Sequence, residues 1–396
     1  MREIYLDNSA TTRVFPEVAD LIHHIYLEDY GNPSSMHHKG VEAEKYLTQA
    51  KHTLADILKV SPKNLYFTSC GSESDNLAII GCARANARQG KHIITTNIEH
   101  PGVTEAMRYL ESEGFEVTYL PVDGQGFIRP QQVAEAVRDE TILVSIMHVN
   151  NEIGTVEPVE EIGEAIKKKN PKCLFHVDAV QSFTKIPILP KKMHIDLLAV
   201  SGHKIHAPKG VAMLYVADGV KIRNIIFGGG QQNGLRSGTE NVAGIAGMAL
   251  AAKMLCDDFE NENDKVRKMR DTFAKKVLQI PDVRINGPLG EHISKTTPES
   301  DTLAAPHIVS VSVAGVRSEV LLHALEEKGV YVSAGSACST HHRDVKGTID
   351  AIGVPKEYRD GTLRVSFSVM NSMEDAEDAA AAFSELVPFL RRFVRR

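Results

Sequence analysis

The sequence predicts an α/β protein whose large domain holds one mostly parallel sheet of seven strands, followed by a smaller α+β domain. Short apolar runs alternate with helical patterns as far as Val216, which is typical of βαβ units. The runs are nearly continuous, as in strands that are buried on both faces. A chain of 396 residues is long enough for two domains. We expect the large domain to span residues 15–258 and the small domain to combine 1–14 with 259–396.

The elements of the large domain follow in chain order. Apolar residues recur at helical spacing from Val41 to Lys59, before Ser61-Pro62. From Gly244 to about Ile280 the pattern predicts one long helix that becomes more charged along its length and bridges the two domains. The seven predicted strands are Leu65–Thr68, His92–Thr95, Val117–Leu120, Thr141–Ile146, Leu174–Val177, Ile195–Val200 and Val211–Val216.

The small domain shows a shorter pattern. Asn286-Gly287-Pro288 breaks the bridging helix, and Glu291 to Pro306 is predicted to be irregular. The remaining predicted elements are strands at Ile308–Val313, Val330–Val332 and Leu363–Phe367, a helix at Ser318–Lys328, and a C-terminal amphipathic helix from about Met373.

Composition narrows the class of function. A net charge of −6 provides no basic field for nucleic acid or anionic lipid, so small-molecule chemistry is the expectation. No apolar run has the length of a membrane span and Met1–Asp7 lacks a signal-peptide core, which predicts a soluble, cytoplasmic protein without a membrane partner. The five cysteines contain no C-x-x-C pair, so we expect neither a disulfide framework nor a zinc site.

Polar clusters follow five of the predicted strands. Each has an ordinary structural explanation on its own, as a helix cap, a turn histidine or an Asx-turn. Together they supply the parts that pyridoxal phosphate requires: a lysine for a Schiff base, a carboxylate for the pyridine nitrogen, a phosphate cradle and a group that stacks on the ring. The clusters are Gly71 with Ser72, Glu99 with His100, Asn150-Asn151-Glu152, Asp178 with Gln181, and Ser201 with His203 and Lys204.

Three further features allow more than one interpretation. The loop Phe227–Asn241 is either a linker or a source of phosphate donors from Arg236, Ser237 and Thr239. Arg364 is either an exposed strand residue or a ligand for a substrate carboxylate. Cys338 lies in a small-residue stretch beside cationic groups that favour a thiolate, which predicts a reactive role, whereas His341-His342 lack further ligands at metal spacing and predict no metal site.

Taken together, the segments resemble the cysteine desulfurases of the NifS/IscS-like type within the class V aminotransferases. The matching segments run through nearly the whole chain in the family's order. They are Tyr5–Thr12, Gly31–Ser35, Glu73–Asn76, His148–Gly154, His176–Asp178, Ser201–Lys204, Arg236–Thr239 and Gly335–Cys338.

The resemblance implies a type I fold for pyridoxal 5'-phosphate and a homodimer with active sites between the subunits. It also implies conversion of L-cysteine to L-alanine, with the sulfur passed to an enzyme cysteine as a persulfide and then to an acceptor protein, either an iron–sulfur scaffold or a thiolation enzyme. The implied catalytic roles are Lys204 as the internal aldimine lysine, His100 stacked on the ring and sharing proton transfer with Lys204, and Cys338 as the sulfur-accepting nucleophile. The implied binding roles are Asp178 as the partner of the pyridine nitrogen, Asn151 and Gln181 at its phenolic oxygen, Gly71, Ser72, Ser201, His203 and a partner-subunit Thr239 at the phosphate, and Arg364 with Asn151 at the substrate.

Two segments depart from the family's pattern. The phosphate turn reads Cys70-Gly71-Ser72 where the family has a glycine, a small residue and threonine, and the segment 339–347 lacks the serine- and glutamate-containing pattern. The alternatives are therefore another pyridoxal-phosphate enzyme on this scaffold, namely a selenocysteine lyase, a cysteine–cystine lyase or a small-amino-acid aminotransferase, or a sulfur-delivery partner of low turnover. A nucleotide-binding dehydrogenase would need Gly228-Gly229-Gly230 between the first strand and its helix, and those glycines lie elsewhere.

Overall fold

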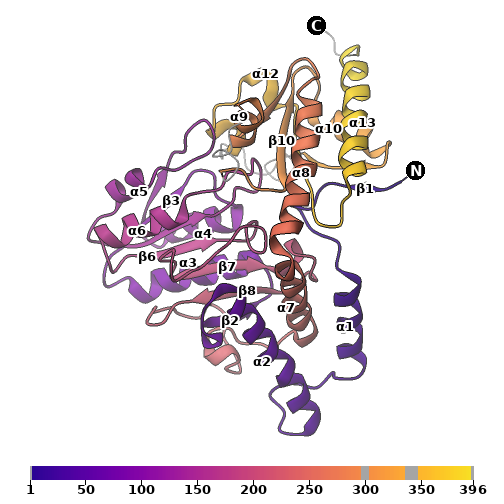
Figure 1. The fold of residues 1–396 in the computed structure, drawn as a ribbon. Coiled ribbons are helices and arrows are strands. Elements are labelled where there is room, and N and C mark those ends of the chain that lie inside the picture. Colours follow the sequence, from indigo (N-terminus) through magenta and orange to yellow (C-terminus); the bar gives the residue numbers. More distant parts are fainter. Residues whose placement is uncertain (1, 296–302, 335–346, 394–396) are drawn as a thin grey trace.

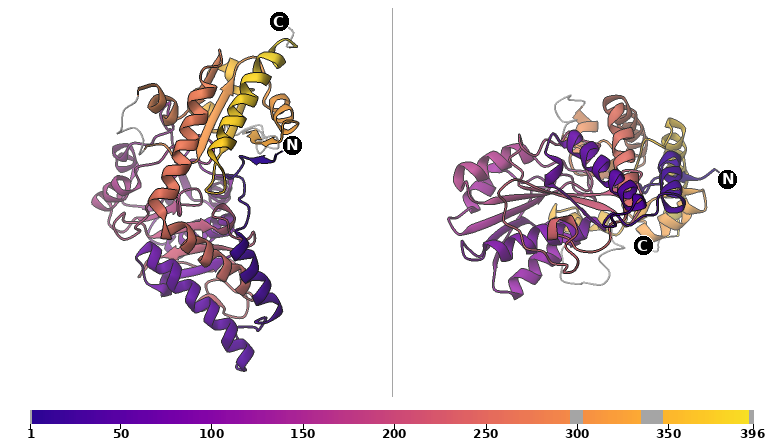
Figure 2. Two further views of the ribbon diagram at one scale, coloured as in Figure 1. Left: turned by 45° about the vertical axis from the view of Figure 1, so that its right-hand side comes forward. Right: turned by 90° about the horizontal axis from the view of Figure 1, so that it is seen from below.

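A computed structural model describes residues 2–295, 303–334 and 347–393 of the chain. Figure 1 shows a large lower part built on one sheet and a smaller upper part in orange and yellow that carries the C-terminal helix. In Figure 2 the same division is visible from two further sides, with α8 running from one part into the other.

The large sheet has seven strands, as predicted. It is parallel except at β8, which runs antiparallel to both of its neighbours, β2 and β7. In spatial order the strands are β2 (Leu65–Thr68), β8 (Ala212–Val216), β7 (Leu197–Ser201), β6 (Leu174–Asp178), β5 (Thr141–Met147), β3 (His92–Thr96) and β4 (Glu116–Leu120).

Helices cover both faces of this sheet and make a three-layer domain. One face packs against α3 and α4, and the other packs against α2, α5, α6 and α7, because each of these helices turns an apolar side toward the strands. The helices and short turns of this part are α1 (Pro16–Leu27), α2 (His38–Leu58), η1 (Pro62–Asn64), α3 (Gly71–Asn86), α4 (Pro101–Ser112), α5 (Pro130–Ala136), α6 (Val159–Lys169), η2 (Gly202–Lys204), η3 (Gln232–Gly234) and α7 (Val242–Asp257).

The small domain has a separate apolar core beneath a four-stranded antiparallel sheet of order β12-β13-β10-β9. The first residues of the chain belong to this core, because β1 pairs in parallel with β11 and Leu6 is fully buried. The elements are β1 (Ile4–Tyr5), α8 (Phe259–Val277), β9 (Val283–Asn286), α9 (Pro288–Lys295), β10 (Ile308–Val313), α10 (Ser318–Glu326), β11 (Val330–Tyr331), β12 (Ser333–Ala334), α11 (Thr348–Ala351), α12 (Lys356–Arg359), β13 (Thr362–Ser366) and α13 (Met373–Arg391).

Two sequence predictions were wrong in detail. The single bridging helix is two helices, α7 and α8, which meet at Asp258, where φ of −130° and ψ of 43° interrupt the helix. Helix α9 begins at Pro288 and occupies part of the stretch predicted to be irregular, because proline fits the first turn of a helix. The preceding helix, α8, already ends at Val277, and strand β9 lies between the two helices. The domain limits at residues 14/15 and 258/259 stay a prediction, which the two separate cores support.

Candidate active site

The carboxyl ends of five strands of the large sheet lie at one edge. Strands β3, β5, β6 and β7 are parallel, and β2 runs in the same direction because β8 is antiparallel to both β2 and β7. The five polar clusters that the sequence singled out follow these strands, so the topology brings them to one rim. Open α/β sheets bind their ligands at this edge.

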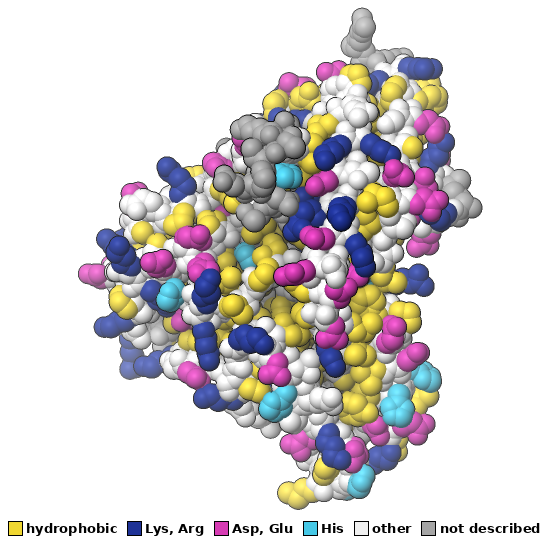
Figure 3. Space-filling view, viewed as in Figure 1, with side chains coloured by type: hydrophobic (Ala, Val, Ile, Leu, Met, Phe, Trp, Pro, Cys, Tyr) yellow, Lys and Arg dark blue, Asp and Glu magenta, His cyan; other side chains and the backbone are white. Residues whose placement is uncertain are grey.

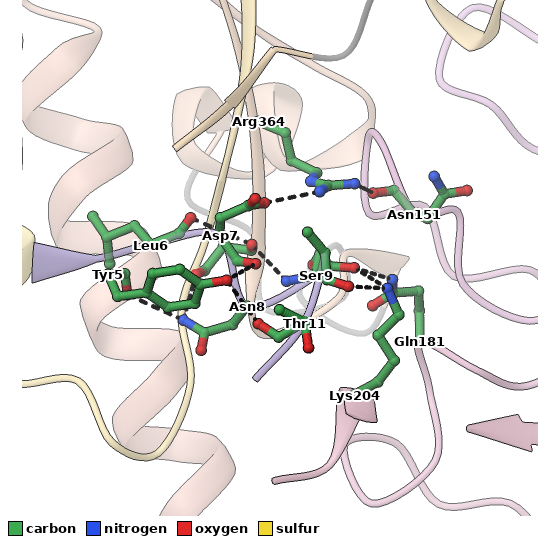
Figure 4. Close-up of polar contacts among 12 residues, drawn as sticks. Tyr5, Leu6, Asp7, Asn8, Ser9, Thr11, Asn151, Gln181, Lys204 and Arg364 are labelled. Atoms are coloured by element: carbon green, nitrogen blue, oxygen red, sulfur yellow. Dashed lines mark hydrogen bonds and ion pairs between the residues drawn. The ribbon is translucent and has the colours of Figure 1, made fainter. Parts of the chain in front are cut away.

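Lys204 ends the short turn η2, directly after β7. Its Nζ donates hydrogen bonds to the carbonyl oxygens of Ser9 at 2.6 Å and Ala10 at 2.7 Å, as Figure 4 shows. Gln181 donates to the same Ser9 oxygen at 2.9 Å. The N-terminal segment therefore forms one wall of the site, and its two carbonyl oxygens stabilise the ammonium form of Lys204.

Asp178 is the last residue of β6 and is only 5% exposed. Its Oδ1 accepts a hydrogen bond from the main-chain N–H of Val180 at 2.9 Å. Burial raises the pKa of this carboxyl, whereas the neighbouring His100 and Lys204 act in the opposite direction. A buried carboxylate beside the cationic Lys204 suits the protonated nitrogen of a pyridine ring.

Two other buried acids lie close to Asp178, and the sequence had not assigned them roles. Burial raises the pKa of Glu99 to about 8, so this side chain is uncharged at neutral pH. Burial, and next the charge of Asp178, also raise the pKa of Asp75 well above its ordinary value. Asp75 Oδ1 lies 3.5 Å from Nε2 of His176, whose pKa burial lowers to about 3. Of these three acids, Asp178 is the one whose charge His100 and Lys204 support.

His100 precedes Pro101 as the N-cap of α4, so the residue that the sequence suggested as a turn histidine also caps a helix. Its Nδ1 accepts a hydrogen bond from the main-chain N–H of Gly102 at 3.0 Å. Burial lowers its pKa, which favours the neutral ring, and a neutral ring that accepts at Nδ1 carries its proton on Nε2. His100 is therefore held in one tautomer beside the Asp178 carboxylate.

The first turn of α3 fits a phosphate group. Gly71 packs so closely against the end of the next strands that a Cβ atom would lie 2.9 Å from Cγ2 of Val180 and 3.6 Å from Cβ of Ser201. The hydroxyl of Ser201 is buried and has no hydrogen-bond partner among the residues that the structure describes. A helix N-terminus, a glycine that lets it approach the neighbouring strand end, and a hydroxyl in need of a partner together match a bound phosphate. The residues present therefore fit pyridoxal phosphate.

The loop before α7 differs from one prediction. Arg236 was a candidate phosphate donor, but its guanidinium pairs with the two carboxylate oxygens of Glu73 at 2.7 Å and 3.2 Å. The two contacts together form a bidentate ion pair, which holds the loop against the first turn of α3. Thr239 is exposed on the same loop.

His203 lies beside Lys204 in η2. Its Nδ1 is 3.3 Å from the hydroxyl oxygen of Thr11, and burial lowers the pKa of His203 to about 4.

Arg364 reaches the site from the small domain, on β13. Its Nη2 lies 3.0 Å from Oδ1 of Asp7, and its Nη1 donates to the main-chain oxygen of Asn151 at 2.9 Å (Figure 4). The side chain is 12% exposed, which excludes the interpretation as an exposed strand residue. The buried Nε has no partner within the described part of the chain, so one edge of the guanidinium can take a carboxylate. The sequence did not single out Asp7 as its partner.

Cys338 lies outside the described residues, as do Gly335–Ala337 and His341-His342. Of the cysteines that are described, burial raises the pKa of Cys173 to about 12 and of Cys256 to about 11. These two thiols are poor nucleophiles, because the thiolate is the reactive form. Within the described ranges, no group of three or more histidine, cysteine or acidic side chains is placed to hold a metal ion.

The class of protein follows from this fold and site and from a family model: the chain belongs to the class V aminotransferase family, which it matches over residues 4–378. Members of this family are pyridoxal-phosphate enzymes, so the prediction of the fold, of the cofactor and of a cofactor-dependent enzyme is confirmed.

The more specific resemblance is also confirmed. The chain is 42% identical over 377 residues, 95% of its length and 92% of the relative's, to a Clostridium botulinum protein named "Cysteine desulfurase IscS". A solved structure titled "NIFS-LIKE PROTEIN" superimposes with a TM-score of 0.90 at 37% identity, covering 98% of this chain and 100% of the other. Another, titled "SspA in complex with cysteine", has a TM-score of 0.78 at 33% identity and covers 93% and 99% of the two chains.

Proposed function

We propose that this protein is a cysteine desulfurase that converts L-cysteine to L-alanine and transfers the sulfur to Cys338. The observation that carries the proposal is the meeting of Lys204, Asp178 and His100 at one sheet edge with Arg364, a carboxylate ligand from the other domain. The relatives named cysteine desulfurase supply the reaction, and the relative whose title includes cysteine supports the substrate.

The residues of the large domain have distinct tasks. Bound pyridoxal phosphate supplies an electron sink for the carbon that bears the substrate's amino group. Lys204 anchors the cofactor and, as the free amine, takes the proton from that carbon, while Asp178 keeps the ring nitrogen protonated. His100 would stack on the ring and share the proton transfer with Lys204. Asn151 and Gln181 would bind the phenolic oxygen of the ring, and Gly71, Ser72, Ser201 and His203 would hold the phosphate.

Arg364 binds the carboxylate of L-cysteine through the edge that contains its Nε. Because its Nη1 and Nη2 are held by Asn151 and Asp7, the orientation of this edge is fixed before the substrate arrives. A guanidinium held from two sides positions a planar carboxylate without a further loss of side-chain entropy.

Cys338 accepts the sulfur as a thiolate. Its sulfur bonds to the substrate sulfur while the bond between that sulfur and the substrate's Cβ breaks, and a proton then adds to Cβ. The products are L-alanine and a persulfide on Cys338, so one cysteine and one enzyme thiol are converted without an external oxidant. The persulfide is delivered to an iron–sulfur scaffold or to a thiolation enzyme in the cytoplasm. None of the described helices is both long and apolar enough to span a membrane.

The active unit is a homodimer in which Thr239 completes the phosphate site of the neighbouring subunit. Thr239 is exposed, and Phe227 on the same loop is 80% exposed. Figure 3 shows hydrophobic side chains gathered over α1 and α7, and near the end of α1 the side chains of Tyr26, Leu27 and Tyr30 are 58–68% exposed. Exposed apolar groups of this kind mark interaction surfaces. Light scattering should give twice the mass of the 43.4 kDa chain. A monomer that retains full activity would contradict this part of the proposal.

The test is alanine release from L-cysteine by the purified protein, together with trapping of the persulfide and its location by mass spectrometry. Cys338→Ser should abolish both signals and leave the cofactor bound. Cys256→Ser is the matched control, because this thiol has a raised pKa and lies in α7. Alanine release that survives in Cys338→Ser would overturn the role of Cys338 as the sulfur acceptor. Consumption of L-cysteine that yields a keto acid instead of alanine would overturn the desulfurase assignment and favour a lyase or an aminotransferase on the same scaffold, neither of which needs this thiol.

A further inference from the structure

A second lysine lies next to Lys204. Lys185 belongs to the turn-rich segment that follows β6, and its Nζ donates a hydrogen bond to the main-chain oxygen of Lys204 at 3.0 Å. Among the described residues Lys185 forms no ion pair. An ammonium group without a carboxylate partner, placed against the cofactor-binding lysine, needs an explanation, because unpaired buried charges are costly.

The titratable groups around Lys185 are mainly basic. Lys185, Lys204, His206 and His307 contribute to the lining of a cavity of about 30 Å³, as does Glu262 from α8. Glu262 already pairs with Lys265. The titratable groups that face Lys204 include Asp7, Asp178, His100 and His203.

The charge of Lys185 acts on its neighbours. Burial, and next the positive charge of Lys204, lower the pKa of Lys185 to about 7. Burial lowers the pKa of His203, His206 and His307, and the positive charge of Lys185 lowers each of them further. When the Lys204 nitrogen is bonded to the cofactor instead of carrying an ammonium charge, one of the two causes that lower the pKa of Lys185 weakens. Lys185 is then more fully charged.

We propose that Lys185 is a positioning residue for Lys204: its hydrogen bond fixes the main chain of Lys204, and its positive charge makes the Lys204 nitrogen a weaker base when that nitrogen is bonded to the cofactor. The proposal rests on the proposed cofactor role of Lys204. A nearby cation disfavours a second positive charge, so the covalent bond to the cofactor would carry less proton at neutral pH. The freed Lys204 would likewise be available as the neutral amine that removes a proton.

The experiment is a pH titration of the visible absorption of the cofactor bound to the full-length protein, which reports protonation of the Lys204 nitrogen without turnover. Three variants separate the two contributions. Lys185→Arg keeps the charge, Lys185→Gln keeps a hydrogen-bond donor without the charge, and Lys185→Met keeps neither. Lys192→Gln is the control, because Lys192 is exposed and pairs with Glu160 at 2.9 Å.

Lys185→Gln and Lys185→Met should raise the midpoint of the titration by about one pH unit, a tenfold change in the proton affinity of the nitrogen. Lys185→Arg and Lys192→Gln should stay within a few tenths of a unit of the parent. A parental midpoint in Lys185→Gln would overturn the role of the charge, even if Lys185→Met fails to fold. Equal upward shifts in Lys185→Arg and Lys185→Gln would also overturn it, because they would reflect altered packing.

Failure of the proposed function gives a different result. If Lys204 does not bind the cofactor, the parent protein will show no absorption that Lys204→Ala removes. The titration of Lys185 variants is interpreted only against a parent that shows this absorption.

Discussion

The two sides of the active site are built in different ways. On the large-domain side, Asp178, His100 and Lys204 stand where a strand ends or a helix begins, and the parallel sheet fixes their spacing. On the small-domain side, Arg364 stands in mid-strand, and its orientation depends on Asp7, which lies 357 residues earlier in the chain. One side is therefore held by regular secondary structure, and the other by contacts between distant segments.

This difference has a functional consequence. Groups that act on the cofactor must keep a fixed geometry, which strand ends provide. A ligand for the substrate must accept and release its partner, and Arg364 is held by two contacts, one with Asp7 of the N-terminal segment and one with the Asn151 carbonyl of the large domain. Substitutions on the large-domain side should therefore lower kcat, whereas substitutions on the small-domain side should change KM for the substrate.

The largest effect is expected from the buried acids. Asp178→Asn should lower kcat by about 10²–10³-fold, because the amide cannot stabilise a protonated ring nitrogen. Glu99→Gln should change kcat by less than about tenfold, since burial raises the pKa of Glu99 to about 8 and the side chain is already uncharged at neutral pH. Steady-state kinetics at pH 7 measure both. Equal losses of kcat in the two variants would contradict this account, because they would show that the charge of Asp178 is not what sets it apart from Glu99.

On the small-domain side, Arg364→Lys should raise KM for L-cysteine by about 10–100-fold with kcat nearly unchanged, because an ammonium cannot reproduce the bidentate contact. Asp7→Asn should lower KM a few-fold, since it removes the negative charge that competes with the substrate carboxylate for Arg364. If Asp7→Asn instead raises KM as Arg364→Lys does, the main task of Asp7 is to hold Arg364 in place.

The smallest effect concerns acid stability on the large-domain side. Burial lowers the pKa of His176 to about 3, so the folded protein keeps this ring neutral, whereas the unfolded chain protonates it near pH 6.5. The unfolded state therefore binds more protons below pH 6.5, and stability falls as the pH falls.

His176→Gln should reduce the loss of unfolding free energy between pH 7 and pH 5 by about 1–2 kcal/mol. Urea unfolding at the two pH values measures it. His38→Gln, at an exposed position of α2, is the control and should lose as much as the parent. An unchanged loss in His176→Gln would mean that other groups cause the acid sensitivity.

The sequence predicted the large-domain side of the active site, whose residues stand at the ends of regular strands and helices. Continuous apolar runs located all seven strands of the large sheet within about two residues, and the polar residues that follow them led directly to Lys204 and Asp178. The resemblance to a known family gave the roles of those residues. Gly71 was found because a small residue at the start of a helix is itself a local signal.

The sequence could not predict the contacts between distant segments. Nothing local in Asp7 indicates that its carboxylate neutralises Arg364, and nothing in Lys185 indicates that it reaches the carbonyl of Lys204. The interruption at Asp258 was missed for a related reason. The helical pattern of the sequence continues on both sides of it, and the helix is divided where one half packs on the large core and the other on the small core.

The most direct test of the central claim is to identify the lysine that holds the cofactor. The protein is loaded with pyridoxal phosphate, reduced with borohydride and digested, and the modified peptide is sequenced by mass spectrometry. The structure predicts modification of Lys204 alone, although Lys185 lies beside it. Modification of Lys185 or of a lysine away from the strand ends, or none at all in folded protein, would contradict the assignment of this sheet edge as the active site.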